Sequence, residues 1–330
     1  MRNEELSRRA LLARTGAVLS GLVLSRGEVF AAGASAAGST AAKGAATSPA
    51  GGAGTIAIGK DFRVNRLGFG AMRICGPGIW GDPEDPAEAR AVLRRAVELG
   101  VNFIDTADAY GPFVSENLIA EVLHPYPKGL LIATKGGLVR PSRERWDRDG
   151  RPEHLREACD ASLKRLKIER IDLYQLHAVD ERVPLEDSVG ELARLQKAGK
   201  IRHVGVSNVT SAQLEKARRI VDVVSVQNRY NVADRSSDPV LAACEQAGIA
   251  FIPWSPLSRN PNEAESPSRK ALEAVAARRG ISSAQAALAW LLARSPAMLP
   301  IPGTSQSKHL DENVSAAAIH FTAEEMKEIG

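Results

Sequence analysis

From residue 66 onward, short apolar runs alternate with longer amphipathic stretches, and this alternation restricts the fold more than any other feature of the sequence. Short runs rich in Val, Ile and Leu are typical of buried strands, whereas apolar residues at three- and four-residue intervals are typical of helices. The predicted strands are residues 66–69, 102–105, 130–134, 172–177, 203–206, 223–227, 250–253 and 298–301. The predicted helices are residues 86–99, 115–123, 152–166, 185–198, 211–219, 239–247, 282–293 and 307–318, with an extra helix at 269–279.

Eight strand–helix pairs within about 270 residues match the repeat of a single (β/α)8 barrel. A doubly wound open sheet is the alternative, but it requires a Gly-rich phosphate loop after its first strand. The sequence there, Gly68-Phe69-Gly70-Ala71, lacks the G-x-G-x-x-G spacing. Before the first strand, turn residues 59–61 separate two alternating segments and predict a hairpin. We therefore expect an α/β fold, a (β/α)8 TIM barrel with a short N-terminal β-hairpin.

The first residues of the chain indicate a processing segment rather than part of the fold. Ser7-Arg8-Arg9 precedes a mild apolar run at residues 16–24, and small residues follow at 31–36. This order resembles a twin-arginine export signal, which carries folded proteins across a bacterial membrane, and the apolar run is too short to span a bilayer. A disordered basic tail is the alternative. The predicted domains are a twin-arginine-type signal peptide at 1–34, a flexible Ala/Gly/Ser linker at 35–54 and the barrel at 55–330.

The predicted export signal bears on the cellular location, and the composition bears on the binding partners. Export would make the twin-arginine machinery a partner and leave the protein periplasmic or secreted, whereas a signal that is not used would leave it cytoplasmic. The net charge of +4 over 330 residues, without a Lys/Arg run in the body of the chain, gives little support to nucleic-acid binding. Cys75, Cys159 and Cys244 show neither metal-binding nor disulfide-framework spacing, and the last two fall within helical patterns, which predicts buried thiols.

Chemically active residue types follow the predicted strands at the end where a barrel collects its catalytic groups. Residues 101–111 form a predicted buried strand that stops at Asp105, followed by a polar loop that carries Tyr110. Singly, such residues have ordinary roles, such as a helix-capping Asp, a solvated Lys or a hydrogen-bonded His. Their recurrence at successive strand ends indicates one shared site. The residues at these ends are Asp105, Tyr110, Lys135, His177, Ser207, Asn208, Gln227, residues 254–257 and residues 302–304.

Four of these groups together suit the reduction of a carbonyl by a reduced nicotinamide, which supplies hydride and leaves the protein to supply a proton. A phenol has a pKa near 10, so Tyr110 needs a nearby cation to act as an acid at neutral pH. Lys135 can be that cation, held in place by an ion pair with Asp105. His177 can donate a hydrogen bond to the carbonyl oxygen.

A second group of residues suits the nicotinamide ring itself. Ser207, Asn208 and Gln227 carry amide and hydroxyl groups that match a carboxamide edge, and Trp254 offers a flat face for stacking. Buried polar side chains satisfied by the backbone are the alternative for the first three.

These motifs resemble those of the aldo-keto reductase family, and the similarity runs from Phe62 to the end of the chain. The matching segments are residues 103–111 (FIDTADAYG), 134–137 (TKGG), 173–177 (LYQLH), 199–208 (GKIRHVGVSN) and 301–304 with 312–313. The resemblance implies a barrel that binds a nicotinamide cofactor without a Rossmann domain, and a catalytic tetrad whose tyrosine donates the proton. The implied tetrad is Asp105, Tyr110, Lys135 and His177. The implied cofactor-binding residues are Ser207, Asn208, Gln227, Trp254, Ser255, Pro256, Leu257, Arg259, Gly303, Thr304, Ser305, Lys308, His309, Glu312 and Asn313.

Two loops decide what the site would hold. Many relatives place Lys and Arg in the last segment to bind the 2′-phosphate of NADPH, whereas Lys308 is the one certain cation here and Arg259 is a second candidate. NADPH is therefore the expected cofactor, with NADH as the alternative. The long polar loop 136–151, with Trp146, predicts one wall of the substrate pocket, and Trp80 is a second lid residue. A solvated loop without contact to substrate is the alternative.

The sequence thus predicts an NADPH-dependent reductase of small aldehydes or ketones, with Tyr110 as proton donor. A nicotinamide-binding barrel that senses redox state or regulates a partner, with weak turnover, is the alternative. A metal-dependent barrel hydrolase is disfavoured because His and Asp do not cluster at the strand ends, so no metal is expected.

Overall fold

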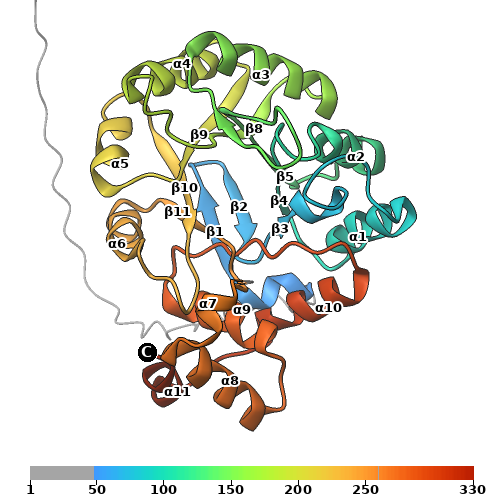
Figure 1. Ribbon diagram of the computed structural model, residues 1–330, viewed down its shortest axis with the longest axis vertical. Coiled ribbons are helices and arrows are strands. Elements are labelled where there is room, and N and C mark those ends of the chain that lie inside the picture. The colour runs from blue at the N-terminus through green and yellow to red at the C-terminus, as the bar shows by residue number, and fades with distance from the viewer. Residues whose placement is uncertain (1–47, 259) are drawn as a thin grey trace, which may run out of the picture. The chain divides into compact units, whose positions relative to one another are not determined.

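A curled sheet of seven parallel strands forms the centre of the fold (Figure 1). The computed structural model describes residues 48–258 and 260–330, so the predicted signal peptide at 1–34 and residues 35–47 of the predicted linker lie outside the described residues. Neighbouring strands are hydrogen-bonded in the order in which they occur along the chain. The strands are β3 (Phe69–Gly70), β4 (Phe103–Asp105), β5 (Leu131–Gly136), β8 (Ile171–Leu176), β9 (Ile201–Ser207), β10 (Val223–Arg229) and β11 (Ala250–Trp254).

The predicted eighth strand, residues 298–301, closes the barrel without forming a regular ladder. Segment 297–302 is hydrogen-bonded to β11 on one side and to the segment around β3 on the other. The bonds run from Phe251 N to Ala297 O (2.8 Å), Leu299 N to Phe251 O (2.9 Å), Gly68 N to Pro300 O (2.9 Å) and Gly70 N to Pro302 O (3.3 Å). Pro300 and Pro302 have no N–H, so this segment accepts bonds on the β3 side that it cannot return. The (β/α)8 TIM barrel is confirmed, with one strand position filled by an irregular segment.

The predicted N-terminal hairpin seals one end of the barrel. It consists of β1 (Thr55–Ile58) and β2 (Phe62–Asn65), which pair antiparallel. Ile58 and Val64 are fully buried in a cluster of inward-facing side chains that come from the N-terminal halves of the barrel strands. The other buried members are Phe103, Leu131, Ala133, Leu173, Val224, Ala250, Ile252, Leu299 and Ile301. A cavity inside the barrel can therefore open only at the carboxyl ends of the strands.

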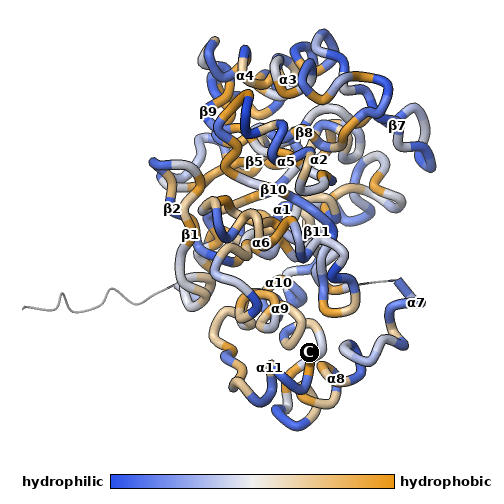
Figure 2. Tube along the Cα trace, turned by 90° about the vertical axis from the view of Figure 1, so that its left-hand side faces the viewer, coloured by the Kyte–Doolittle hydropathy of each residue, from blue (hydrophilic) through white to orange (hydrophobic). Residues whose placement is uncertain are grey.

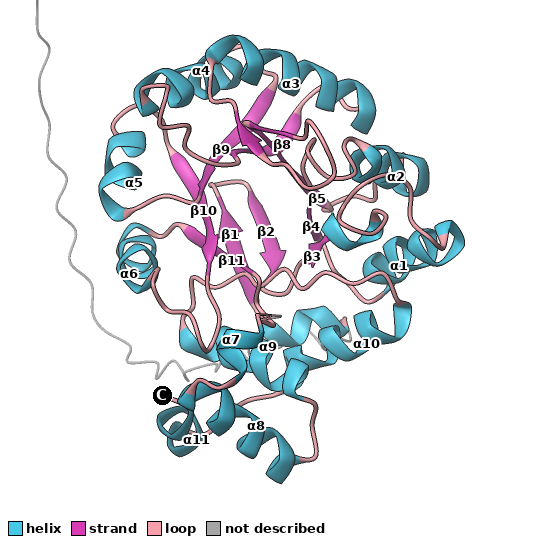
Figure 3. Cartoon of the chain, in the orientation of Figure 1, coloured by secondary structure: helices cyan, strands magenta, loops and turns pink. Residues whose placement is uncertain are grey.

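Helices cover the outside of the sheet, one after nearly every strand (Figure 3). Their apolar faces pack on the strands, and the hydrophobic colour in Figure 2 gathers on the inner strands while the outer loops are mostly hydrophilic. The helices are α1 (Pro86–Glu98), α2 (Val114–Leu123), α3 (Pro152–Leu166), α4 (Leu185–Lys197), α5 (Ser211–Arg218), α6 (Asp238–Ala247), α8 (Pro267–Arg279), α9 (Ser283–Arg294) and α10 (Ser307–Ser315). Within the described ranges, no helix combines the length and the apolar character that crossing a membrane requires.

Short elements that the sequence patterns did not predict complete the domain. They carry too few residues to show a helical or strand period. These elements are η2 (Ala71–Ile74), β6 (Leu138–Val139), β7 (Asp147–Arg148), α7 (Pro261–Ala264) and α11 (Ala323–Ile329), whereas η3 (Ala316–Ala318) is the end of the predicted helix 307–318. Two of them, β6 and β7, pair antiparallel and turn the predicted polar loop 136–151 into a small hairpin.

The barrel domain begins earlier than the predicted linker allows, because residues 48–54 belong to it. They form η1 (Pro49–Ala53), in which Ala50 is fully buried and its N–H donates to Leu99 O at 3.0 Å. A Cβ atom at Gly52 would lie 3.1 Å from Ala317 O. The Ala/Gly composition, which predicted a segment with little to bury, permits this close approach of backbones. The prediction of a linker through residue 54 is wrong for its last seven residues.

Gly205 in β9 leaves room for polar side chains inside the barrel. A Cβ atom here would lie 2.2 Å from Ser225 Oγ and 2.8 Å from Gln175 Cγ, in an interior packed too densely to yield. We expect Gly205→Ala to lower the free energy of unfolding by about 1–3 kcal/mol in urea denaturation. Gly190→Ala in α4 is the matched control: no atom lies within 4 Å of its Cβ position, and alanine favours a helix by about 1 kcal/mol. Equal stability of the two variants would contradict the prediction.

Candidate active site

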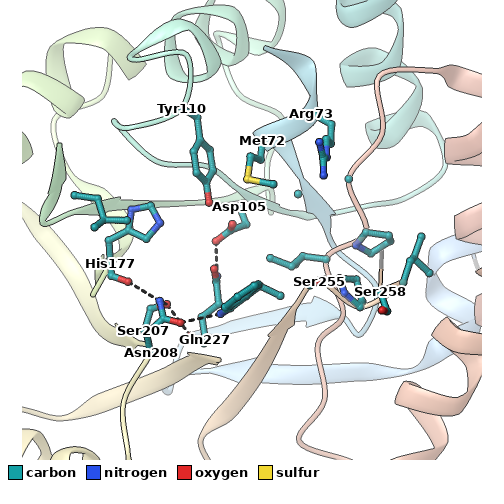
Figure 4. A pocket seen from close by; sticks show the side chains of 18 of the residues that line it. Met72, Arg73, Asp105, Tyr110, His177, Ser207, Asn208, Gln227, Ser255 and Ser258 are labelled. Carbon is teal, nitrogen blue, oxygen red and sulfur yellow. Dashed lines mark hydrogen bonds between the residues drawn. The ribbon is translucent and has the colours of Figure 1, made fainter. Parts of the chain in front are cut away.

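A cavity of about 440 Å³ opens at the carboxyl ends of the strands (Figure 4). Tyr110 and His177 lie on one side of it, and Ser255 and Ser258 lie on the opposite side. The predicted site residues that line it are Asp105, Tyr110, Trp146, His177, Ser207, Asn208, Gln227, Trp254, Ser255, Pro256, Leu257, Pro302 and Gly303. The lining residues that the sequence patterns did not assign to a role are Gly70, Met72, Arg73, Leu138, Ser258 and Ile301.

The centre of the site is a buried ion pair. Lys135 in β5 is fully buried, and its Nζ lies 2.6 Å from Oδ2 of Asp105, the last residue of β4. The same ammonium donates to Thr106 O at 2.9 Å. Burial lowers the pKa of Lys135, and the negative charge of Asp105 opposes this shift. The positive charge of Lys135 and the negative charge of Asp105 therefore lie side by side in the interior of the protein.

Two glutamines satisfy the second oxygen of Asp105. Gln175 Nε2 lies 3.2 Å and Gln227 Nε2 lies 2.8 Å from Asp105 Oδ1, and both amides donate. Lys135, Gln175 and Gln227 all donate to this carboxylate, so both of its oxygens act as acceptors. Gln227 was predicted to contact the cofactor, whereas Gln175 was predicted only as part of the motif at 173–177, with no role of its own. The alternating position of Gln175 in its strand, inward beside His177, is the signal that could have identified it.

Tyr110 presents its phenol to the cavity from the loop after β4. Its side chain is 6% exposed, and Lys135 Nζ lies 3.4 Å from the phenol oxygen. Gly111 makes the turn that follows: its φ is 102°, and a Cβ atom there would lie 2.4 Å from Val114 Cβ. A larger residue at this position would displace the loop that carries Tyr110.

The pKa of Tyr110 shifts in the direction opposite to the expectation that Lys135 lowers it. Burial raises the pKa of Tyr110 well above its usual value, and the charge of Asp105 adds to the rise. The ammonium lies closer to Asp105 (2.6 Å) than to the phenol (3.4 Å), so its charge is largely balanced by the carboxylate. Tyr110 thus stays protonated at neutral pH, which is the state that a proton donor requires.

His177 follows β8 and faces Tyr110, with ring centroids 5.7 Å apart and an interplanar angle of 81°. Burial lowers the pKa of His177 well below its usual value, and the charge of Lys135 lowers it further. The imidazole is therefore neutral at physiological pH. Its Nδ1 is buried without a hydrogen-bond partner among the described residues, which leaves Nε2 as the nitrogen that can serve a ligand in the cavity.

A chain of hydrogen bonds connects the residues predicted to recognise the nicotinamide amide. Asn208 has a φ of 57°, in the left-handed region that Asn tolerates. Its Nδ2 donates to His177 O (3.0 Å) and to Ser207 Oγ (3.1 Å), while its Oδ1 accepts from Trp254 Nε1 (3.0 Å). Ser207 Oγ in turn donates to Gln227 O (2.6 Å). These groups are satisfied by one another, so a carboxamide must share or replace some of these bonds.

The remaining predicted site residues lie away from this cavity or outside the described residues. Ser305 lines a neighbouring cavity of about 370 Å³. Trp80, predicted as a lid residue of the substrate pocket, does not line the main cavity. Those of the C-terminal segment that line neither cavity are Thr304, Lys308, His309, Glu312 and Asn313. Arg259 lies outside the described residues.

The chemistry of the lining fits a nicotinamide nucleotide. The indole of Trp254 offers a flat face, and the amide and hydroxyl of Asn208 and Ser207 lie beside it. At the opposite border, Gly70 and Gly303 bring two backbones so close that a Cβ atom at Gly70 would lie 2.6 Å from Ile301 O. In the part of the chain that the structure describes, no group of three or more His, Cys, Asp or Glu side chains could hold a metal ion.

Comparison with known proteins identifies the family of the chain. Residues 66–330 match the model of the aldo/keto reductase family. An uncharacterized oxidoreductase of Schizosaccharomyces pombe is 51% identical over 272 residues, which cover 82% of this chain and 87% of that protein. Pyridoxine 4-dehydrogenase of Escherichia coli is 42% identical over 268 residues, covering 79% of this chain and 92% of that protein.

A solved structure extends the comparison to three dimensions. The aldo-keto reductase of Klebsiella pneumoniae in complex with NADPH is similar with a TM-score of 0.70 and 25% identity, and the match covers 83% of this chain and 93% of that chain. Sequence, fold and site agree, and the chain belongs to the aldo/keto reductase family of oxidoreductases.

Proposed function

We propose that this protein reduces small aldehydes or ketones with NADPH, and that Tyr110 donates the proton to the carbonyl oxygen. The observation that carries the proposal is the buried Asp105–Lys135 pair beside the protonated phenol of Tyr110, next to a neutral His177 on one cavity. The complex of the Klebsiella pneumoniae relative supports NADPH as the cofactor.

Residues of the protein supply the proton, stabilise the resulting charge and donate a hydrogen bond to the carbonyl oxygen. When bound, the reduced nicotinamide supplies hydride to the carbonyl carbon. Tyr110 gives its proton to the oxygen as that oxygen becomes an alkoxide, a stronger base than a phenolate. Lys135, 3.4 Å from the phenol oxygen, stabilises the negative charge that remains there. His177, being neutral, donates a hydrogen bond to the same carbonyl oxygen and leaves the proton transfer to Tyr110.

The walls of the cavity favour a planar aromatic carbonyl compound. Met72, Leu138 and Trp146 line the cavity together with Tyr110 and present apolar surface. The pyridoxine 4-dehydrogenase relative acts on a substituted pyridine, as its name states, and this supports an aromatic aldehyde as substrate.

Oxidation of NADPH by the full chain tests the proposal. The substrates offered are pyridoxal, benzaldehyde, propanal and a dione, each with NADPH and with NADH, and the reverse reaction is measured with pyridoxine. We expect turnover with NADPH that is faster for the aromatic aldehydes. Tight NADPH binding without oxidation by any of these compounds would contradict the proposal.

Lys308 is proposed to contact the 2′-phosphate of NADPH. It is exposed in the first turn of α10, a helix N-terminus that favours anions. Glu88 Oε1 already accepts from Ser307 N at 2.6 Å, so a bound phosphate would share this helix end with a carboxylate. The preference for NADPH over NADH should therefore be modest. We expect Lys308→Met to raise the Kd of NADPH about tenfold and leave that of NADH unchanged, measured by titration calorimetry. Lys128→Met, an exposed lysine before β5, is the control. An equal loss for both cofactors would refute the contact.

A further inference from the structure

Arg140 is a buried guanidinium whose role the proposed reaction leaves open. Arg140 is 8% exposed. Among residues 48–258 and 260–330, its guanidinium forms no ion pair with a carboxylate. Instead it donates to three backbone carbonyls from two loops: Ile79 O (2.9 Å), Gly78 O (3.2 Å) and Arg143 O. Burying a charge against carbonyl groups alone is costly, so the fold must gain something from this placement.

The same guanidinium packs between two tryptophans. Its carbon lies 3.8 Å from the ring centroid of Trp146 and 5.3 Å from that of Trp80. Trp146 is 37% exposed, lines the catalytic cavity and lies edge-on to Tyr110, with centroids 6.5 Å apart. The hairpin of β6 and β7 that carries Trp146 has only two paired positions, so it offers little to fix this indole. The planar face of Arg140 fixes it instead.

Backbone strain at Ile79 is a second, independent indication that the loop 76–81 is held in one conformation. This β-branched residue has a φ of 58°, a conformation that is disfavoured without compensating contacts. Its carbonyl is an acceptor for Arg140 Nη1. The next residues pair with the loop of the phenol, where Gly81 N donates to Gly111 O at 2.6 Å. Arg140 therefore joins the loop 76–81 to the hairpin of Trp146, and the loop 76–81 is in turn hydrogen-bonded to the loop beside Tyr110.

We propose that Arg140 is a positioning residue that fixes Trp146 as a wall of the substrate subsite, and that this wall selects planar aromatic carbonyl compounds over small aliphatic ones. The inference rests on the proposed carbonyl reductase function. Arg140 does not line the cavity and acts on the substrate only through Trp146.

Kinetics of three variants with benzaldehyde and propanal test the selection. Arg140→Met keeps a flexible, unbranched apolar side chain and removes the guanidinium fork. We expect it to raise KM for benzaldehyde about tenfold with little change in kcat, and to change kcat/KM for propanal less than about threefold. Arg140→Lys keeps the charge without the planar fork and is expected to behave like the Met variant. Arg148→Met in the same hairpin, half-exposed and paired with Glu181, is the matched control and should match the wild type.

A double-mutant cycle tests whether the effect passes through Trp146. In a Trp146→Leu background, Arg140→Met should cause no further loss with benzaldehyde, because the wall is already gone. Full additivity of the two changes, or full recovery of benzaldehyde selectivity in Arg140→Lys, would overturn the proposal.

Limited trypsin digestion provides a measurement that needs no turnover. The freed hairpin of Arg140→Met should be cut after Arg143 and Arg145 at least about five times faster than in wild type, since proteolysis follows local opening. The melting temperature of each variant separates local from global unfolding. If the wild type reduces no carbonyl compound, the proposed function fails, and faster cutting still supports the positioning role of Arg140. Unchanged cutting and unchanged selectivity would refute it.

Discussion

Tyr110→Phe is expected to lower kcat for carbonyl reduction by about 10²–10⁴-fold while the Kd of NADPH stays within about twofold of wild type. The substitution removes one oxygen from a side chain that is 6% exposed, and the ring contacts to His177 and Trp146 do not require that oxygen. The fold should therefore be kept while the transferable proton is lost. Single-turnover oxidation of bound NADPH measures the chemical step directly.

The same assignment predicts a flat pH profile around neutrality. Burial raises the pKa of Tyr110 well above its usual value near 10 and lowers the pKa of His177 well below 6.5. As pH rises, the rate should fall only when the phenol loses its proton. As pH falls, it should drop only when the imidazole gains a charge beside Lys135. Between about pH 7 and 9, kcat/KM for reduction should therefore change less than about threefold.

Tyr126→Phe is the matched control for Tyr110→Phe. Tyr126 donates its hydroxyl proton to Leu166 O at 2.8 Å, outside the catalytic cavity. Its loss should leave kcat unchanged. A Tyr110→Phe variant that keeps more than about a tenth of the wild-type kcat would show that another group, with His177 as the first candidate, donates the proton.

The residue types of the site were predictable because a parallel barrel converts position in the sequence into position in space. Asp105, Lys135 and His177 each end or follow a strand, and the carboxyl ends of parallel strands meet at one face. The strand pattern thus brought together residues that lie far apart in the chain. It also predicted eight strands, of which seven are regular strands in the structure.

The partners within the site were not predictable, because they depend on register and burial. Gln227 lies 122 residues from Asp105 in the sequence, and nothing local distinguishes a bond to the carboxylate from a bond to a cofactor. The pKa of Tyr110 is raised rather than lowered because the phenol is buried and because the charge of Asp105 adds to the rise. No motif encodes this burial, or the 2.6 Å distance at which Asp105 balances Lys135. The residues around Arg140 show no helical or strand periodicity. The sequence therefore could not predict that this side chain is hydrogen-bonded to two loops.

Lys135→Met is the second substitution for which we expect a large effect, this time on stability as well as activity. It leaves the buried carboxylate of Asp105 without its cation, and removal of one partner of a buried pair typically costs about 3–5 kcal/mol of unfolding free energy. It also removes the charge 3.4 Å from the phenol oxygen, so kcat should fall by at least about 100-fold. Urea denaturation and NADPH oxidation measure the two effects separately.

The double variant Asp105→Asn/Lys135→Met separates stability from catalysis. The asparagine amide keeps an oxygen for the donors Gln175 and Gln227, and no unpaired charge remains in the interior, so at least half of the lost stability should return. Activity should not return, because no cation lies beside Tyr110. Lys200→Met is the control: its pair with Asp160 is equally short at 2.6 Å but about two-fifths exposed, and its loss should cost less than about 1 kcal/mol. A double variant with restored activity would show that the ion pair serves the fold alone.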